Sequence, residues 1–275
     1  MISCEIILID DCSLEYYKRI NEAVITKENY IELSKNVGRS KIRNLFLEYA
    51  KYEYLLFLDC DSLIIDESFL NNYIQAILKN PELSVLCGGR VYQAEKPEPN
   101  RLLRWEYGIK KESKPFDIRN QQPNKSFMTN NFLIKKSTFE QHPFDERITT
   151  YGHEDTLFGY ELLKYNIAIQ HIENPILNGH LETNHEFLDK TENAVKNLNH
   201  ILRYVNYDSR FIDSIALLTF YAKLKEKKMI PLIRVLSFLY NSSIKKLLSN
   251  GCVNLKLFNF YKLGVFVKHQ QKNIS

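Results

Sequence analysis

The sequence predicts an α/β domain with a mainly parallel sheet and flanking helices, followed by a helical, basic region. Strand and helix signals alternate through the first half of the chain, as in proteins built on parallel strands. The apolar run 54–58 ends in Asp59, Cys60 and Asp61, which is typical of a buried strand with polar groups at its carboxyl end. From residue 187 onward, apolar residues recur at helical spacing.

The expected elements follow from these patterns in chain order. Short apolar runs predict strands at 5–10, 30–33, 54–58, 84–92, 131–134 and 167–172. Helical spacing predicts helices at 14–24, 38–50, 68–78 and 153–165. Residues 93–127 contain four prolines and no clear periodicity, so we expect a long functional or mobile loop there.

The carboxyl-terminal region reads as several helices. One apolar stripe comprises Val195, Leu198, Leu202 and Val205. A second stripe lies within 212–219, and Pro231 can open a third helix. We therefore divide the chain into a domain of residues 1–186 and a helical region of residues 187–275.

Composition restricts the class of protein. The 275 residues are 44% hydrophobic and 25% charged, which allows an ordinary globular core. The five cysteines are scattered without CxxC spacing, which argues against a disulfide framework or a zinc site and fits a reducing compartment. No signal peptide is visible, so we expect a cytoplasmic protein.

The positive charge gathers at the carboxyl-terminal end. From Thr219 onward there are eleven Lys and Arg residues and one acidic residue, Glu226. We expect residues 219–275 to lie on an anionic membrane surface at its cytoplasmic face, where Lys245 and Lys246 beside Leu247, Leu248 and Phe258 fit an interfacial helix. Helices packed on the domain, with a solvated basic face, are an equal alternative. Nucleic-acid binding is not expected, because no recognised motif accompanies the charge.

Two carboxylates spaced one residue apart are the strongest chemical signal. Asp59 and Asp61 follow the predicted strand 54–58. Such a pair can hold a divalent cation against a phosphate-bearing substrate, although Asp residues also terminate strands in turns.

Other candidate residues are individually weaker. Asp11 after the first strand can bind a nucleotide or cap a helix. Arg43 lies in a basic helix start that can attract phosphate or face solvent. Glu154 and Asp155 open a helix, where they favour its dipole or supply a general base. His180 is structural or a ligand of a divalent ion.

In their order along the chain, these pieces resemble glycosyltransferase family 2, the inverting nucleotide-sugar transferases of the GT-A fold. The matching stretches span residues 5 to about 190 and read EIILIDDCS, NVGRSKIRN, YLLFLDCDS, TNNFLI, FDERITTYGHEDTLFG and NPILNGHLE. The resemblance implies a UDP-sugar donor, a glycan or lipid-linked acceptor, and Mn²⁺ or Mg²⁺ as cofactor.

The resemblance also implies individual roles. Asp11 would contact the nucleotide base, Arg43 would lie near the nucleotide, and Asp59 would contact the ribose or metal. Asp61 would bind the metal, and His180 lies near a third ligand position of related enzymes. Asp155 matches the catalytic base, and Glu154 would help to hold the acceptor. Trp105 would stack on an acceptor sugar or pack in the core.

One departure from the family pattern leaves alternatives open. The family usually has a further strand and helix before the strand that ends in Asp-Asp, whereas here that strand starts at Glu5. A truncated, catalytically impaired nucleotide-sugar-binding protein is therefore one alternative. A nucleotidyltransferase is another, although such enzymes usually open with a glycine-rich phosphate loop that this sequence lacks.

Overall fold

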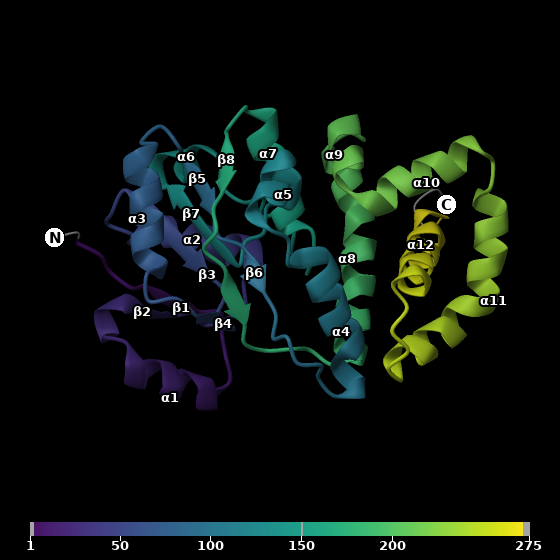
Figure 1. Ribbon diagram of the computed structural model, residues 1–275, viewed down its shortest axis with the longest axis horizontal. Coiled ribbons are helices and arrows are strands. Elements are labelled where there is room, and N and C mark those ends of the chain that lie inside the picture. The colour runs from purple at the N-terminus through teal and green to yellow at the C-terminus, as the bar shows by residue number, and fades with distance from the viewer. Residues whose placement is uncertain (1–2, 150, 272–275) are drawn as a thin grey trace.

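The computed structural model describes residues 3–149 and 151–271 and shows an α/β body joined to a set of carboxyl-terminal helices (Figure 1). The strands are β1 (Leu8–Asp10), β2 (Tyr30–Glu32), β3 (Tyr54–Leu58), β4 (Ser62–Ile64), β5 (Val85–Cys87), β6 (Arg90–Val91), β7 (Asn131–Lys135), β8 (Ile169–His171) and β9 (Ile176–Asn178). The helices of the body are α1 (Glu15–Val24), α2 (Arg39–Tyr49), α3 (Phe69–Lys79), α4 (Leu102–Tyr107), the π-helix η3 (Gly108–Glu112), α5 (Phe116–Gln121), α6 (Lys136–Gln141) and α7 (Glu154–Lys164).

The central sheet has the strand order β3-β7-β5-β8 and is mixed. This confirms the α/β class and corrects the expectation of a mainly parallel sheet. β7 runs antiparallel to both β3 and β5, whereas β5 and β8 are parallel. Asn131 at the start of β7 pairs with Leu58 at the end of β3. The chain therefore returns to the carboxyl end of β3, and β7 runs back along it.

The expected strand 84–92 is two strands in two different sheets. The chain turns at Gly88 and Gly89, so that β5 joins the central sheet and β6 joins the sheet β4-β9-β6. A Cβ atom at Gly88 would lie 2.3 Å from the carbonyl oxygen of Asn174. Because glycine has no Cβ, the backbone can pass close to Asn174 at the point where β5 ends and the chain turns towards β6.

The expected loop 93–127 is largely helical, which corrects that prediction. It contains α4, η3 and α5, and Leu103 and Trp105 are buried. The guanidinium of Arg119 on α5 donates to the carbonyl oxygens of Cys87 at 3.2 Å and Ile172 at 2.9 Å. These long-range bonds fix α5 against the ends of β5 and β8.

The first two strands stand apart from the central sheet. β1 and β2 pair in parallel and form a two-stranded sheet, while the hydrogen-bonded neighbour of β3 is β7. Within the described residues, no strand pairs with the other edge of β3.

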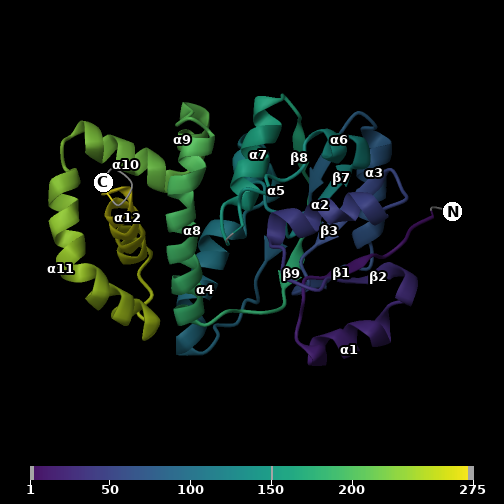
Figure 2. The ribbon, with the colours of Figure 1, turned by 180° about the vertical axis from the view of Figure 1, so that it is seen from behind.

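The carboxyl-terminal region is helical, as expected. Its helices are α8 (Asn184–Tyr204), α9 (Ser209–Ser214), α10 (Ala216–Glu226), α11 (Ile230–Ser249) and α12 (Leu255–Gln271). The stripe within 212–219 is divided between α9 and α10 by the extended Ile215. α12 lies between α8 and α11 (Figure 2). Across residues 3–149 and 151–271, no helix has the length and apolar character needed to cross a membrane.

Helix α8 also supports the loop that leads into α7. Gly152 in this loop has a φ of 109°, and a Cβ atom there would lie 2.3 Å from the Cβ of Ala194 on α8. The side-chain amide of Asn197 on α8 donates to the Gly152 carbonyl at 3.0 Å. The expected boundary between residues 186 and 187 falls in the first turn of α8. This helix therefore contacts both the loop before α7 and the other carboxyl-terminal helices.

We expect Gly152→Ala to lower the free energy of unfolding by about 2–3 kcal/mol, because the new methyl group strains the backbone and collides with Ala194. Urea denaturation would measure the loss. In Gly152→Ala/Ala194→Gly, removal of the collision should recover part of the stability. An unchanged midpoint in the single variant would show that α8 does not constrain this loop.

Candidate active site

Asp59, at the carboxyl end of β3, lies between two arginines. Its Oδ1 accepts a hydrogen bond from Nη2 of Arg43 at 3.2 Å. Its Oδ2 lies 3.7 Å from Nη2 of Arg90. Both guanidinium groups are largely buried, so the carboxylate is held in one place by charge from two elements, α2 and β6.

Asp61 has a different environment. Its backbone carbonyl accepts a hydrogen bond of 2.7 Å from the N–H of Gly179, which brings the loop after β9 alongside the end of β3. His180 follows in this loop and is exposed. Among the described residues, no hydrogen bond or ion pair occupies the Asp61 carboxylate, so it is the carboxylate of the pair that remains available to a ligand.

Asp11 is bound to the start of α2. Its Oδ1 accepts from the N–H of Val37 at 2.6 Å and its Oδ2 from the N–H of Gly38 at 3.2 Å. It does not cap α1, whose N-cap is Leu14 without a side-chain hydrogen bond; in the turn before α1, Asp10 accepts from the N–H of Ser13 at 2.6 Å. Asp11 therefore connects the end of β1 to the helix that carries Arg43.

Arg43 joins the end of β3 to the start of α7. Besides Asp59, it faces Glu154, with Nη1 4.0 Å from Oε1. Arg43 and Glu154 have side-chain exposures of only 9% and 6%. Arg39, one turn earlier on α2, also donates to Glu154 at 3.4 Å. The sequence-predicted residues Arg43, Asp59 and Glu154 thus meet at one point.

The loop before α7 has an unusual backbone that directs the two acidic residues. Gly152 and His153 both have positive φ angles, and the N–H of Gly152 donates to Oε2 of Glu154 at 3.1 Å. Asp155 accepts from the N–H of Thr156 at 2.6 Å. Burial, reinforced by the charge of Glu154, raises the pKa of Asp155 to about 6. A carboxylate with such a pKa is suited to accept a proton near neutral pH.

A second group of charges, which sequence reasoning missed, holds Arg90. Glu112 in η3 lies 3.7 Å from Nη1 of Arg90 and 3.1 Å from Nη2 of Arg104. Arg104 also donates to Glu182 at 3.0 Å. Although burial alone would raise it, the charges of Arg104 and Arg90 hold the pKa of Glu112 below its usual value. The sequence signal for this group is the number of charged residues within 93–127, the segment expected to be a loop.

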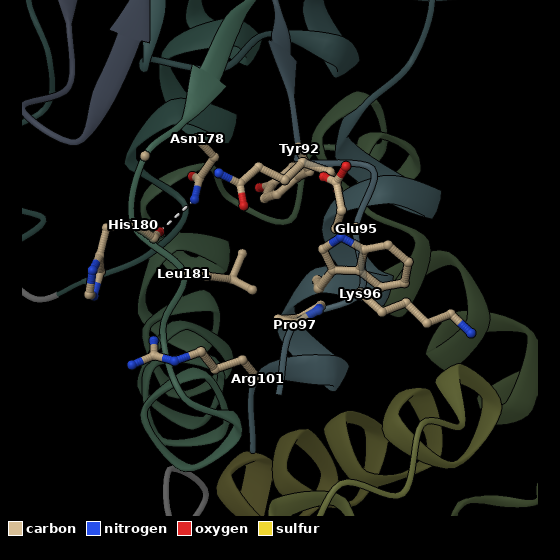
Figure 3. A pocket seen from close by; sticks show the side chains of 11 residues that line it. Tyr92, Glu95, Lys96, Pro97, Arg101, Asn178, His180 and Leu181 are labelled. Carbon is tan, nitrogen blue, oxygen red and sulfur yellow. Dashed lines mark hydrogen bonds between the residues drawn. The ribbon is translucent and has the colours of Figure 1, made fainter. Parts of the chain in front are cut away.

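A cavity of about 320 Å³ lies beside the loop after β9 (Figure 3). Its lining includes Tyr92, Trp105 and Leu181. Trp105 is nearly buried and donates from Nε1 to the carbonyl of Gln93 at 2.8 Å, so it combines core packing with one exposed edge at the cavity. Figure 3 shows His180 and Arg101 on one side of the cavity and Lys96 on the other.

The residues fit a cation that is shared with a substrate phosphate. Within the described residues, no three His, Cys, Asp or Glu side chains form a group able to hold a metal ion by themselves. A cation such as Mg²⁺ is commonly held by one or two carboxylates together with substrate phosphates. The Asp61 carboxylate has no hydrogen bond or ion pair among the described residues, so it is available as such a ligand. His180 lies in the neighbouring loop.

An α/β fold with an aspartate pair at the carboxyl end of a strand is the arrangement expected of transferases that use nucleotide-activated substrates. Residues 2–143 match the model of the family described as glycosyl transferase family 2. The chain therefore belongs to glycosyltransferase family 2.

Two kinds of relatives resemble this chain. Chondroitin synthase of Escherichia coli is 27% identical over an alignment of 205 residues that covers 62% of this chain and 29% of that protein. The chain thus spans less than a third of that relative. The mannosyltransferase PcManGT from Pyrobaculum calidifontis, in complex with GDP-Man and Mn²⁺, has 12% identity and a TM-score of 0.58, covering 98% of this chain and 77% of its own. It shares the fold.

S. aureus TarS in complex with UDP has 19% identity and a TM-score of 0.49, with coverage of 98% of this chain and 82% of that chain.

We expect Arg43→Ala to lower the free energy of unfolding by about 3 kcal/mol, because it leaves the buried Glu154 with less compensating charge. Arg147→Ala is the matched control: Arg147 is exposed and pairs with Asp145 at the surface, so its loss should cost below about 1 kcal/mol. Urea denaturation compares the two. Equal losses would show that Arg43 does not hold the site together.

Proposed function

We propose that this glycosyltransferase is inverting and metal-dependent, and that it moves a sugar from a UDP-sugar to a hydroxyl of a glycan or lipid-linked saccharide. The observation that carries the proposal is the contact of Arg43 with both Asp59, at the end of β3, and Glu154, which precedes Asp155. Donor-side and acceptor-side carboxylates therefore lie around one guanidinium. The complex of PcManGT, which shares the fold, with GDP-Man and Mn²⁺ is in keeping with a nucleotide-sugar donor.

The donor would bind along the ends of β1 and β3. Asp11 would contact the nucleotide base and Asp59 the ribose, while Arg43 would lie near the negative charge of the phosphates. Asp61 would hold Mn²⁺ or Mg²⁺, with His180 as a further ligand from the adjoining loop. When bound, such a cation offsets the negative charge that develops on the nucleoside diphosphate as it leaves.

The acceptor would approach from the side of α7. Asp155 takes the proton of the attacking hydroxyl, and attack opposite the leaving diphosphate inverts the anomeric configuration. Glu154 would help to hold the acceptor, and its bonds to Arg39 and Gly152 fix its orientation. Trp105 lines the cavity, and its indole would contact the acceptor sugar there.

The unpaired edge of β3 favours one alternative, a nucleotide-sugar-binding protein without turnover. A panel of UDP- and GDP-sugars, tested for metal-dependent nucleotide release, separates the two functions. Release that requires Mn²⁺ or Mg²⁺ supports transfer, whereas tight UDP binding without release from any donor supports the binding protein. A nucleotidyltransferase would instead release pyrophosphate from a nucleoside triphosphate.

For location, we propose the cytoplasmic face of a membrane, with the basic region 219–275 toward anionic lipid. The eleven Lys and Arg residues of this region against a single acidic residue support the proposal, since anionic lipid attracts polybasic segments.

We expect Asp155→Asn to lower kcat by about 100-fold or more, because the amide cannot accept the proton, while the Kd for UDP stays unchanged. Glu161→Gln, on the same helix but paired with Lys164, is the control and should retain activity. Nucleotide release and calorimetric titration measure the two quantities. Normal turnover of Asp155→Asn would remove Asp155 from the role of base.

The wild-type pH profile follows from the raised pKa of Asp155, about 6. Below this pH the carboxyl is protonated and cannot act as a base, so kcat/KM should fall about tenfold per pH unit and level off above it. The residual activity of Asp155→Asn should lack this acidic limb. A limb that persists in the variant would assign the titration to another group.

We expect Asp61→Asn to raise the Kd for UDP roughly tenfold or more in the presence of Mn²⁺, since it removes a charged metal ligand. Without metal, the variant and the wild type should bind UDP equally. Glu67→Gln, at an exposed carboxylate six residues beyond Asp61, serves as the control. Equal affinities with Mn²⁺ would place the metal elsewhere.

A further inference from the structure

Helix α11 carries large apolar side chains on its solvent side. Its inner side is packed on α12 and α8 through residues such as Ile233, Ile244 and Leu248. The opposite side presents a set that we call the α11 outer face: Leu232, Val235, Phe238 and Leu239, all exposed. Figures 1 and 2 both show α11 at the edge of the molecule farthest from the sheets.

The α11 outer face differs from the usual solvent side of a packed helix, which is polar. Phe238 has 87% of its surface exposed, so the described chain does not cover it. Because the inner side is already packed, only the outer face can meet another surface. Contiguous exposed apolar groups of this kind mark sites of protein or membrane contact.

The charges around the α11 outer face identify the partner. Exposed Lys225, Lys227 and Lys228 come directly before α11, and Lys246 extends the same side of the helix. Glu226 is the single acidic residue from Thr219 to the end of the chain. A second copy of the chain would bring like charges together, whereas an anionic surface complements them.

Only some of the residues that the sequence singled out for this role are engaged inside the protein. Lys245 donates to Asp189 at 2.8 Å and to Glu192 at 2.7 Å, which ties α11 to α8, and Leu248 and Phe258 are buried. Lys246 and Leu247 are exposed, and the outer face adds further exposed apolar residues.

We propose that the α11 outer face inserts into the interfacial region of an anionic lipid bilayer, with the lysines before α11 on the lipid headgroups. The proposal rests on the membrane location given above and names the surface that makes the contact. Apolar side chains of an interfacial helix reach about 5–10 Å into the boundary between headgroups and acyl chains, which matches one exposed row on a helix whose other side is packed.

Vesicle flotation of the full-length protein tests the proposal. Wild type should float with phosphatidylcholine vesicles that contain phosphatidylglycerol and remain unbound with phosphatidylcholine alone. Phe238→Ser/Leu239→Ser should lower recovery with the anionic vesicles about tenfold, since it removes two apolar anchors. The matched control is Leu70→Ser/Leu78→Ser on α3, where the two leucines are 55% and 66% exposed, and it should float like wild type.

Equal flotation of wild type and Phe238→Ser/Leu239→Ser would overturn the proposal, as would wild type that stays unbound with anionic vesicles. A dimer in light scattering that this variant dissociates would assign the face to a second copy instead. Circular dichroism checks that each variant is folded. Metal-dependent nucleotide release, measured without vesicles, reports on the transferase function separately, so that failure of one proposal is distinguishable from failure of the other.

Discussion

The site depends on the burial of Arg43 between Asp59 and Glu154. These carboxylates belong to β3 and α7, which are almost a hundred residues apart in the chain, and one guanidinium lies within 4.0 Å of both. A buried charge without partners is strongly unfavourable, so the two carboxylates compensate Arg43, while Arg90 and Arg39 add positive charge beside Asp59 and Glu154. The shared guanidinium thereby links the end of β3 to the start of α7.

The charges continue outward from Arg43 as a connected series. Asp59 leads to Arg90, Glu112, Arg104 and Glu182, and Glu182 ends the series at Lys190 on α8. The positive and negative members alternate, so that each carboxylate of the series lies next to a cation. Asp61 and Asp155, which we propose for the metal and the proton, stand outside the series, and among the described residues neither forms an ion pair.

Local patterns in the sequence were sufficient for some parts of this structure. The run 54–58 is uniformly apolar, and it forms β3 with the expected bounds. In contrast, α4 and α5 have six residues each and lie among prolines, so they have too few turns for a periodic signal. Their stability comes from distant partners, such as the carbonyl groups bound by Arg119. The direction of β7 likewise depends on where the intervening segment returns, which no local pattern encodes.

The contact between Gly152 and Ala194 decides how the protein can be divided. Because α8 presses against the turn that leads into Glu154 and Asp155, the smallest unit in which this turn is supported includes α8. Exchange of carboxyl-terminal helices among relatives would have to begin beyond Tyr204, since a graft made at residue 187 would leave the turn without its backing.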